Sequence, residues 1–186
     1  MTLDDMISLI QGGVPHTSAT WADFGAGWGN FTQTLAHLLE PDSTIYAIDR
    51  DHRVFQHLRR DWSSPIQLHT ISADFTLVID DLSITRHSLD GILMANALHF
   101  VARNGSRNQQ ETLQRIQKYL RPDGRLLLVE YDEERPRSWL PYPVSYRLFA
   151  QLATDAGFTD VTLIGQRRSP SSGITMYAAV AHPPAL

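Results

Sequence analysis

The stretch Trp21-Ala-Asp-Phe-Gly-Ala-Gly-Trp-Gly-Asn30 decides the fold class of this chain. It begins like a buried strand with an acidic residue, Asp23, near its end, and three glycines follow before a helix start. Gly25, Gly27 and Gly29 let the backbone turn tightly and approach a ligand where a Cβ would collide. The pattern therefore predicts a strand, a ligand-contacting turn and a helix in direct succession.

A second acidic residue follows at the distance that nucleotide-binding folds use. Residues 44–48 form an apolar run that ends at Asp49, about 20 residues past Gly29. A carboxylate at this place can accept hydrogen bonds from two ribose hydroxyls, and its structural alternative is a cap for the next helix. Together the glycine turn and the acid predict that the chain binds a cofactor that carries a nucleoside.

The composition is that of a globular chain. With 186 residues, 42% of them hydrophobic and 19% charged, the chain can bury its own core. The net charge of −4 argues against a nucleic-acid surface, and the lack of cysteine excludes disulfides, zinc–thiolate sites and thiol nucleophiles. The acidic start is unlike a signal peptide, and no apolar stretch approaches the roughly 20 residues that cross a bilayer. We expect one domain over residues 1–186 and a cytoplasmic protein that binds neither nucleic acid nor membrane.

Strands and helices alternate along most of the chain. A flanking helix is expected within residues 1–13, where Thr2-Leu-Asp-Asp5 has the form of a capping box. The expected strands lie at about 19–24, 44–48, 66–71, 90–95 and 125–131, and the expected helices at about 30–40, 51–62, 106–120 and 144–156.

The last part of the chain breaks this alternation. Two strands, at about 161–166 and 174–181, are joined by the turn-rich residues 168–173 and indicate a hairpin. The segment Arg121-Pro-Asp-Gly124 is expected to be a turn between the helix and the fifth strand. Five strand–helix units and a hairpin predict an α/β fold, with one doubly wound, mostly parallel sheet between two helical layers.

With these elements in place, the chain resembles the class I S-adenosylmethionine-dependent methyltransferases over about residues 15–182. The resemblance rests on residues 23–29, Asp49, Ala73-Asp74, Asn96-Ala-Leu-His-Phe100 and Leu120-Arg-Pro-Asp-Gly-Arg-Leu-Leu-Leu128. The last two motifs resemble the type 11 and type 12 branch, which methylates small molecules. The family implies a Rossmann-like, seven-stranded sheet in the order 3-2-1-4-5-7-6 with strand seven antiparallel. It also implies S-adenosylmethionine as cofactor, S-adenosylhomocysteine as product and no metal.

The resemblance assigns the cofactor to the carboxyl ends of the first four strands. Asp23 would lie near its ammonium, Asp49 near its ribose and Asp74 near its adenine amine. The structural alternatives are a tight turn without ligand, a helix cap or a solvated loop; for Asn96 the alternative is a loop residue that bonds its own backbone, and for Phe75 a place in the core. The expected cofactor residues are Asp23, Gly25, Ala26, Gly27, Asp49, Arg50, Ala73, Asp74, Phe75 and Asn96.

The acceptor is expected above the ends of the fourth and fifth strands. His99 follows the fourth strand and is the candidate general base, with packing beside the cofactor as its alternative. Trp28 could line the cofactor pocket or the substrate pocket, or could pack under the first helix. His52 and His57 do not share a helix face, so no metal pair is expected. The expected substrate residues are Trp28, His99, Tyr131, Trp139 and Tyr142, of which the last two could also be incidental loop aromatics.

A sulfonium methyl group is already activated, so positioning of the acceptor can supply roughly 7–11 kcal/mol of barrier reduction. The sequence has no Asn/Asp-Pro-Pro-Tyr segment of the kind found in enzymes that methylate nucleobase amines, and a small-molecule acceptor is expected. Two other functions remain open: a non-catalytic relative that still binds the cofactor, and a nicotinamide-dependent oxidoreductase, which the glycine spacing disfavours. The cap over the site is small, so the pocket either stays open to a bulky substrate or is closed by a second subunit, as in a homodimer.

Overall fold

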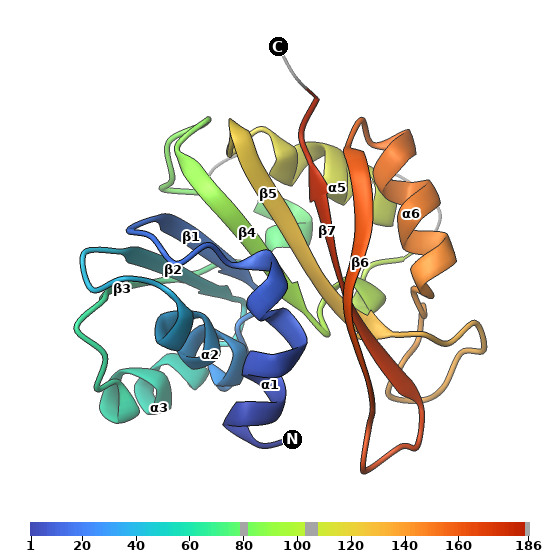
Figure 1. Ribbon diagram of the computed structural model, residues 1–186, viewed down its shortest axis with the longest axis horizontal. Helices are drawn as coiled ribbons and strands as arrows, with labels where there is room; N and C mark the ends of the chain where they lie inside the picture. Colours follow the sequence, from blue (N-terminus) through green and yellow to red (C-terminus); the bar gives the residue numbers. More distant parts are fainter. Residues whose placement is uncertain (79–81, 103–107, 185–186) are drawn as a thin grey trace.

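The apolar strands β1 (Thr20–Phe24) and β4 (Leu89–Ala95) lie side by side at the centre of a seven-stranded sheet. The computed structural model describes residues 1–78, 82–102 and 108–184. The strand order is β3-β2-β1-β4-β5-β7-β6, as Figure 1 shows. The other parallel strands are β2 (Thr44–Asp49), β3 (Gln67–Ser72) and β5 (Leu120–Tyr131).

The terminal hairpin is formed by β6 (Thr159–Arg168) and β7 (Thr175–His182). β7 lies between β5 and β6 and runs antiparallel to both. The predicted fold class, strand order and antiparallel last strand are confirmed. The fold is a Rossmann-like doubly wound sheet, in which the strand order reverses between β1 and β4.

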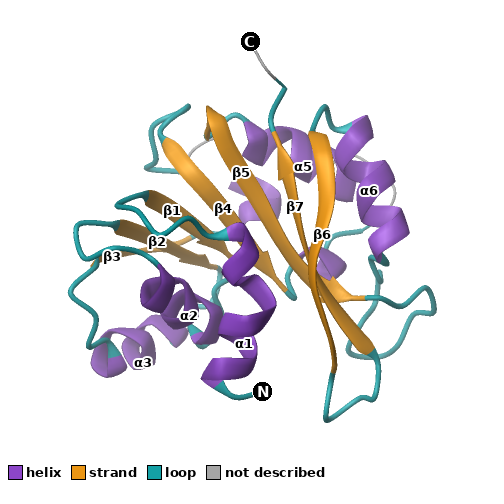
Figure 2. Ribbon diagram, viewed as in Figure 1, coloured by secondary structure: helices purple, strands orange, loops and turns teal. Residues whose placement is uncertain are grey.

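Helices cover both faces of the sheet, as Figure 2 shows for α1 and α2 in front and α5 and α6 behind. Alternate residues of each strand point to opposite faces, so Leu93 and Leu127 pack with α1 and α2, whereas Ile92 and Leu126 pack with α5 and α6. Within the described residues no helix is both long and apolar enough to cross a membrane. The helices are α1 (Leu3–Ile10), α2 (Asn30–Leu38), α3 (Val54–Asp61), α4 (Phe75–Val78), α5 (Gln109–Gln117) and α6 (Tyr146–Asp155).

Several boundaries differ by a few residues from the sequence-based expectation, among them those of α5 and β5. The helix expected at 106–120 is α5, which ends at Gln117, and residues 106 and 107 lie outside the described residues. The expected turn at Arg121–Gly124 lies within β5 as an irregularity, where pairing with β4 passes from Leu120 directly to Arg125. Asp90 supports this bulge, because its carboxylate pairs with Arg121 at 2.7 Å and also accepts a hydrogen bond from the backbone N–H of Thr20.

The contact between Gly91 and Trp21 fixes the spacing of the two central strands. A Cβ built on Gly91 would lie 2.3 Å from the buried Trp21 indole. We predict that Gly91→Ala lowers the free energy of unfolding by about 3 kcal/mol, because a rigid core ring cannot yield. Urea denaturation measures the change, and Gly12→Ala, whose Cβ would make only an ordinary 3.6 Å contact, is the matched control. An unchanged midpoint for Gly91→Ala would contradict this packing.

Candidate functional site

A cavity of about 600 Å³ opens at the carboxyl ends of β1 to β4, in the size range of small-molecule sites. This is the end of the sheet at which open α/β folds bind ligands, beside the reversal of strand order. The structure brings all the expected cofactor residues to this cavity, and Trp28 lines it as well. The expected residues that line it are Asp23, Gly25, Ala26, Gly27, Asp49, Arg50, Ala73, Asp74, Phe75 and Asn96.

The glycine turn after β1 needs a left-handed backbone. Gly25 has φ of 83° and Gly27 has φ of 52°. A Cβ on Gly25 would lie 2.6 Å from the Ala97 Cβ, so this glycine permits close contact with the segment after β4. A Cβ on Gly27 would meet no protein atom within 4 Å, although Gly27 lines the cavity. The missing side chain of Gly27 therefore leaves room for a ligand against the backbone.

Asp49 fixes the turn to the end of β2. Its Oδ2 accepts a hydrogen bond from the Gly27 N–H at 2.8 Å, and its Oδ1 accepts one from the Asp51 N–H at 2.9 Å. Each carboxylate oxygen keeps a second lone pair for a further donor. Asp49 thus bonds the backbone of the glycine turn and of the segment before α3, without capping that helix, and it also lines the cavity as an acceptor.

Asp23 is a buried carboxylate at the floor of the cavity. Its Oδ2 accepts a hydrogen bond from the Thr32 hydroxyl at 2.6 Å, while Oδ1 has no partner in the described part of the chain. Burial raises the pKa of this carboxyl to about 7; the Thr32 bond opposes the rise and the nearby charge of Asp49 adds to it. An unpartnered buried oxygen in a cavity is suited to a cationic donor on a ligand.

Asn96 offers a second unpartnered oxygen in the same cavity. Its backbone has φ of 54°, a conformation that asparagine tolerates better than most residues. Its N–H donates to the Val129 carbonyl at 2.9 Å, which holds the segment to β5. The buried side-chain Oδ1 has no hydrogen-bond partner among the described residues.

The segment after β3 combines structural and cavity-lining roles. Asp74 Oδ1 accepts hydrogen bonds from the backbone N–H and the hydroxyl of Thr76, as a residue at a helix start does. Phe75 packs edge-on against Phe24, with ring centroids 5.8 Å apart, and also lines the cavity. Asp74 thus bonds the start of α4 and Phe75 packs in the core, as their structural alternatives predict, and both residues also line the cavity.

The other expected substrate residues, His99, Tyr131, Trp139 and Tyr142, are not in the lining of this cavity, and their contact with a substrate stays a prediction. The His99 ring is 3% exposed, and its Nδ1 lies 2.7 Å from Glu130 Oε2. Glu130, fully buried, also accepts a hydrogen bond from the His99 backbone N–H at 3.1 Å. These two hydrogen bonds hold the buried His99 ring against β5, whereas Ala95, Asn96, Ala97 and Phe100 of the same segment, residues 95–100, line the cavity.

The aromatic residues around the 135–143 loop lie away from the cavity too. Tyr131 and Trp139 pack edge-on, with ring centroids 5.0 Å apart. The backbone N–H of Tyr142 donates to the His99 carbonyl at 3.1 Å. The loop is therefore bonded to segment 95–100 through Tyr142 and His99. The side chains of Tyr131, Trp139 and Tyr142 do not line the cavity.

Residues that the sequence did not assign to the site also line the cavity. The large apolar ones are Met1, Met6, Phe31 and Phe100, and the smaller or polar ones are Asn30, Asp51, Thr76, Ala95 and Ala97. Phe100 is the last residue of the Asn96–Phe100 motif, and its place in that motif is the sequence signal that could have assigned it to the cavity. Phe31 looked like an ordinary inward residue of its helix, and nothing in the sequence separates these two roles.

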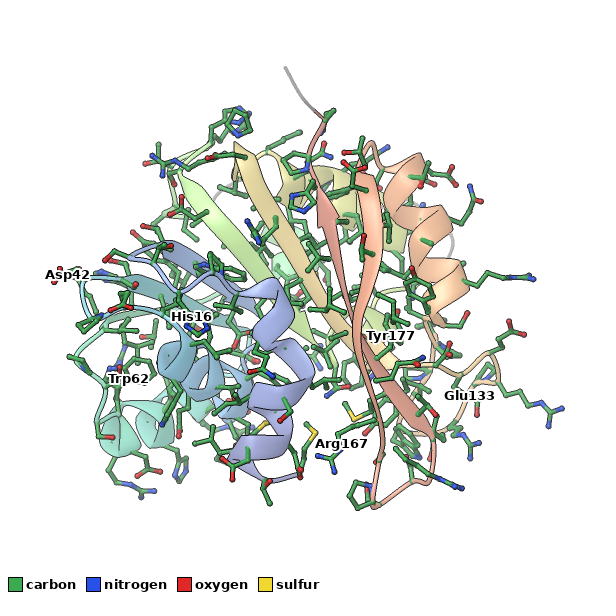
Figure 3. The ribbon with its side chains drawn as sticks, in the orientation of Figure 1. His16, Asp42, Trp62, Glu133, Arg167 and Tyr177 are labelled. Atoms are coloured by element: carbon green, nitrogen blue, oxygen red, sulfur yellow. The ribbon has the colours of Figure 1, made fainter. Side chains whose placement is uncertain are left out.

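Met6 of helix α1, and Met1 just before the helix, line the cavity, and α1 is also held against β6. Its capping box is confirmed by reciprocal bonds between Thr2 and Asp5, and Asp5 pairs with Arg167 at 2.5 Å (Figure 3). These contacts lower the pKa of Asp5 to about 2, the backbone bond from Thr2 first and Arg167 second.

Among the residues that the structure describes, no group of three or more histidine, aspartate and glutamate side chains could hold a metal ion. The expectation that the chain uses no metal stays a prediction.

Comparison with known proteins identifies the family. Residues 22–126 match the sequence profile of the methyltransferase domain, so the chain belongs to this family. The family and the fold define the class as Rossmann-like, S-adenosylmethionine-dependent methyltransferases. No curated protein matches the chain in sequence.

Solved structures share the fold at low identity. The CurJ carbon methyltransferase is 17% identical with a TM-score of 0.73, covering 94% of this chain and 51% of its own. The 1,6-didemethyltoxoflavin-N1-methyltransferase of Burkholderia thailandensis is 19% identical with a TM-score of 0.71, covering 97% and 77%. Human N-acetylserotonin methyltransferase is 17% identical with a TM-score of 0.66, covering 98% and 52%. The chain thus spans about half the length of the CurJ and human proteins.

The buried Asp23 carboxylate makes the stability of the ligand-free protein depend on pH. Its pKa rises from 3.8 in the unfolded chain to about 7, so the folded state binds more protons between these values and stability falls as pH rises through them. We predict that Asp23→Asn raises the free energy of unfolding at pH 8 by roughly 2 kcal/mol, with a gain that shrinks toward pH 4.

Chemical denaturation at both pH values measures the gain, with Asp42→Asn on an exposed turn as the control (Figure 3). The Asp42 variant should match the parent at each pH. If Asp23→Asn raises the free energy of unfolding equally at pH 4 and pH 8, burial of the ionised Asp23 carboxylate does not destabilise the fold, and the raised pKa is refuted.

Proposed function

We propose that this chain is a methyltransferase that binds S-adenosylmethionine in the cavity and methylates a small molecule. The observation that carries the proposal is the unpartnered buried Oδ1 of Asp23. It lies in one cavity with Asp49 and Asp74 from the next two strand ends. A cofactor with an ammonium, a ribose and an adenine amine has a donor for each of these three carboxylates.

The residues present fit this cofactor. Asp23 Oδ1 would accept from the ammonium, with Asn96 Oδ1 as a second acceptor nearby. The second lone pairs of Asp49 would accept from the ribose hydroxyls, and Asp74 from the adenine amine, with Phe75 packing beside the base. When bound, the cofactor supplies a methyl group on a sulfonium. The chain's own task is then to orient an acceptor and exclude water.

The small-molecule acceptor is supported by the neighbours and by charge. The Burkholderia structure contains 1,6-didemethyltoxoflavin with S-adenosylhomocysteine, and the human structure contains the methyl donor. The net charge of −4 gives this chain no excess of cations for a phosphate backbone. A non-catalytic relative is the alternative, and turnover distinguishes it from the enzyme.

The test is a calorimetric titration with S-adenosylhomocysteine. We predict binding by the parent protein and a loss of about 1.5–3 kcal/mol in Asp49→Ala, the range for hydrogen bonds to a charged group. NAD is the control ligand and should neither bind nor raise the melting temperature. Because Asp49 also accepts from Gly27 and Asp51, circular dichroism must show that the variant is folded. Unchanged affinity in a folded variant would refute the ribose assignment.

His99 as general base stays a separate prediction. Glu130 holds Nδ1, so proton acceptance would fall to Nε2 of a ring that does not line the cavity. A base that touches the acceptor contributes about 100-fold or more to turnover. Because the His99 ring bonds Glu130 and does not line the cavity, we expect His99→Ala to act only by displacing segment 95–100. The expected loss in kcat is then less than about tenfold.

The pH profile of kcat distinguishes the two roles. A positioning role leaves the profile of His99→Ala parallel to that of the parent, and Glu130→Gln should then resemble His99→Ala. Loss of the acidic limb of the profile together with a 100-fold drop would establish His99 as the base.

A further inference from the structure

Exposed apolar side chains gather at the mouth of the cavity. Of the seven large hydrophobic side chains that are exposed among the described residues, three line it: Met1, Trp28 and Phe100. Trp28 is 62% exposed and Phe100 59% exposed. None of the three has a part in the hydrogen bonds assigned to the cofactor. Such a group of exposed apolar side chains beside a cavity indicates a surface that a ligand covers.

The two rings come from neighbouring parts of the fold. Trp28 belongs to the turn after β1, and Phe100 ends the 3-10 turn Leu98–Phe100 that follows β4, the strand next to β1. Each ring packs against a histidine ring. The centroids of Trp28 and His57 are 4.9 Å apart, and those of Phe100 and His99 are 4.2 Å apart. Supported rings lose little conformational entropy when a flat ligand packs against them.

The charged residues of the cavity are mostly acidic. Among the described side chains, Asp23, Asp49, Asp51 and Asp74 line it against one cationic side chain, Arg50. Asp51 is partly balanced from outside by Arg53, at 2.7 Å. S-adenosylhomocysteine is a zwitterion, so its binding leaves the balance acidic, and a sulfonium adds one positive charge only. In a partly enclosed site of this kind, a carboxylate or phosphate on the acceptor meets net repulsion.

From these two observations we infer that the acceptor is a planar aromatic molecule, uncharged or cationic, and that it packs against Trp28 and Phe100. This inference rests on the proposed function and names the acceptor class of the same site. A cationic acceptor gains twice, from the acidic lining and from the faces of the aromatic rings.

The test uses three para-substituted phenols of similar size whose short side chains end in groups of different charge. They are tyramine, which is cationic, tyrosol, which is neutral, and 4-hydroxyphenylacetate, which is anionic. Each is titrated by calorimetry into the protein saturated with S-adenosylhomocysteine. We expect tyramine and tyrosol to bind at least tenfold more tightly than the anion. The preference for tyramine over the anion should shrink in about 0.5 M salt, where charges are screened.

Two variants separate ring packing from charge. Trp28→Ala should weaken tyrosol at least tenfold, whereas Leu163→Ala, which removes an exposed apolar side chain on β6 outside the cavity lining, should bind like the parent. Equal or tighter binding of the anion, failure of all three phenols to bind, or an unaffected Trp28→Ala variant would overturn the inference while the proposed function stood. Failure of S-adenosylhomocysteine itself to bind would instead refute the proposed function, and this inference with it.

Discussion

The left-handed turn at Gly25–Gly27, tied to the end of β2, is the constraint on which the site depends. The Ile48 carbonyl accepts hydrogen bonds from the N–H groups of both Gly25 and Ala26, and the Asp49 carboxylate accepts from Gly27. These bonds join the end of β1 to the end of β2, so the turn cannot move without its neighbour. The cavity is therefore preorganised by the backbone, and its ligand need not order it.

The same site carries a cost in stability. Asp23 is buried with one oxygen unpartnered, and its pKa is raised to about 7 mainly because burial disfavours the charged form. A folded core without function would place an apolar or amide side chain here. A carboxylate here is explained if a ligand cation offsets its burial, and the ammonium of the proposed cofactor is such a cation. Asp23, which destabilises the ligand-free fold, therefore also indicates that the ligand carries a cationic group.

The sequence predicted the fold, and it predicted which residues after β1 to β4 line the cavity, because both depend on local patterns. Glycines that need positive φ, acids at strand ends and a terminal hairpin are each visible within a few residues. The sequence could not show that Tyr131, Trp139 and Tyr142 lie outside this lining. Which face a loop side chain takes depends on tertiary contacts, here the bond from the Tyr142 N–H to the His99 carbonyl. No spacing in the sequence records that contact.

Glu130 shows how the two halves of the site are joined. It is a fully buried carboxylate on β5 that bonds both the ring and the backbone of His99, and so fixes the segment after β4. Asn96 and Phe100 of that segment line the same cavity. A displacement of Glu130 would therefore move together the residue proposed to contact the cofactor, Asn96, and the one proposed to contact the acceptor, Phe100. Since in-line transfer depends on the relative position of donor and acceptor, one segment with contacts to both would provide that alignment without a residue that performs the chemistry.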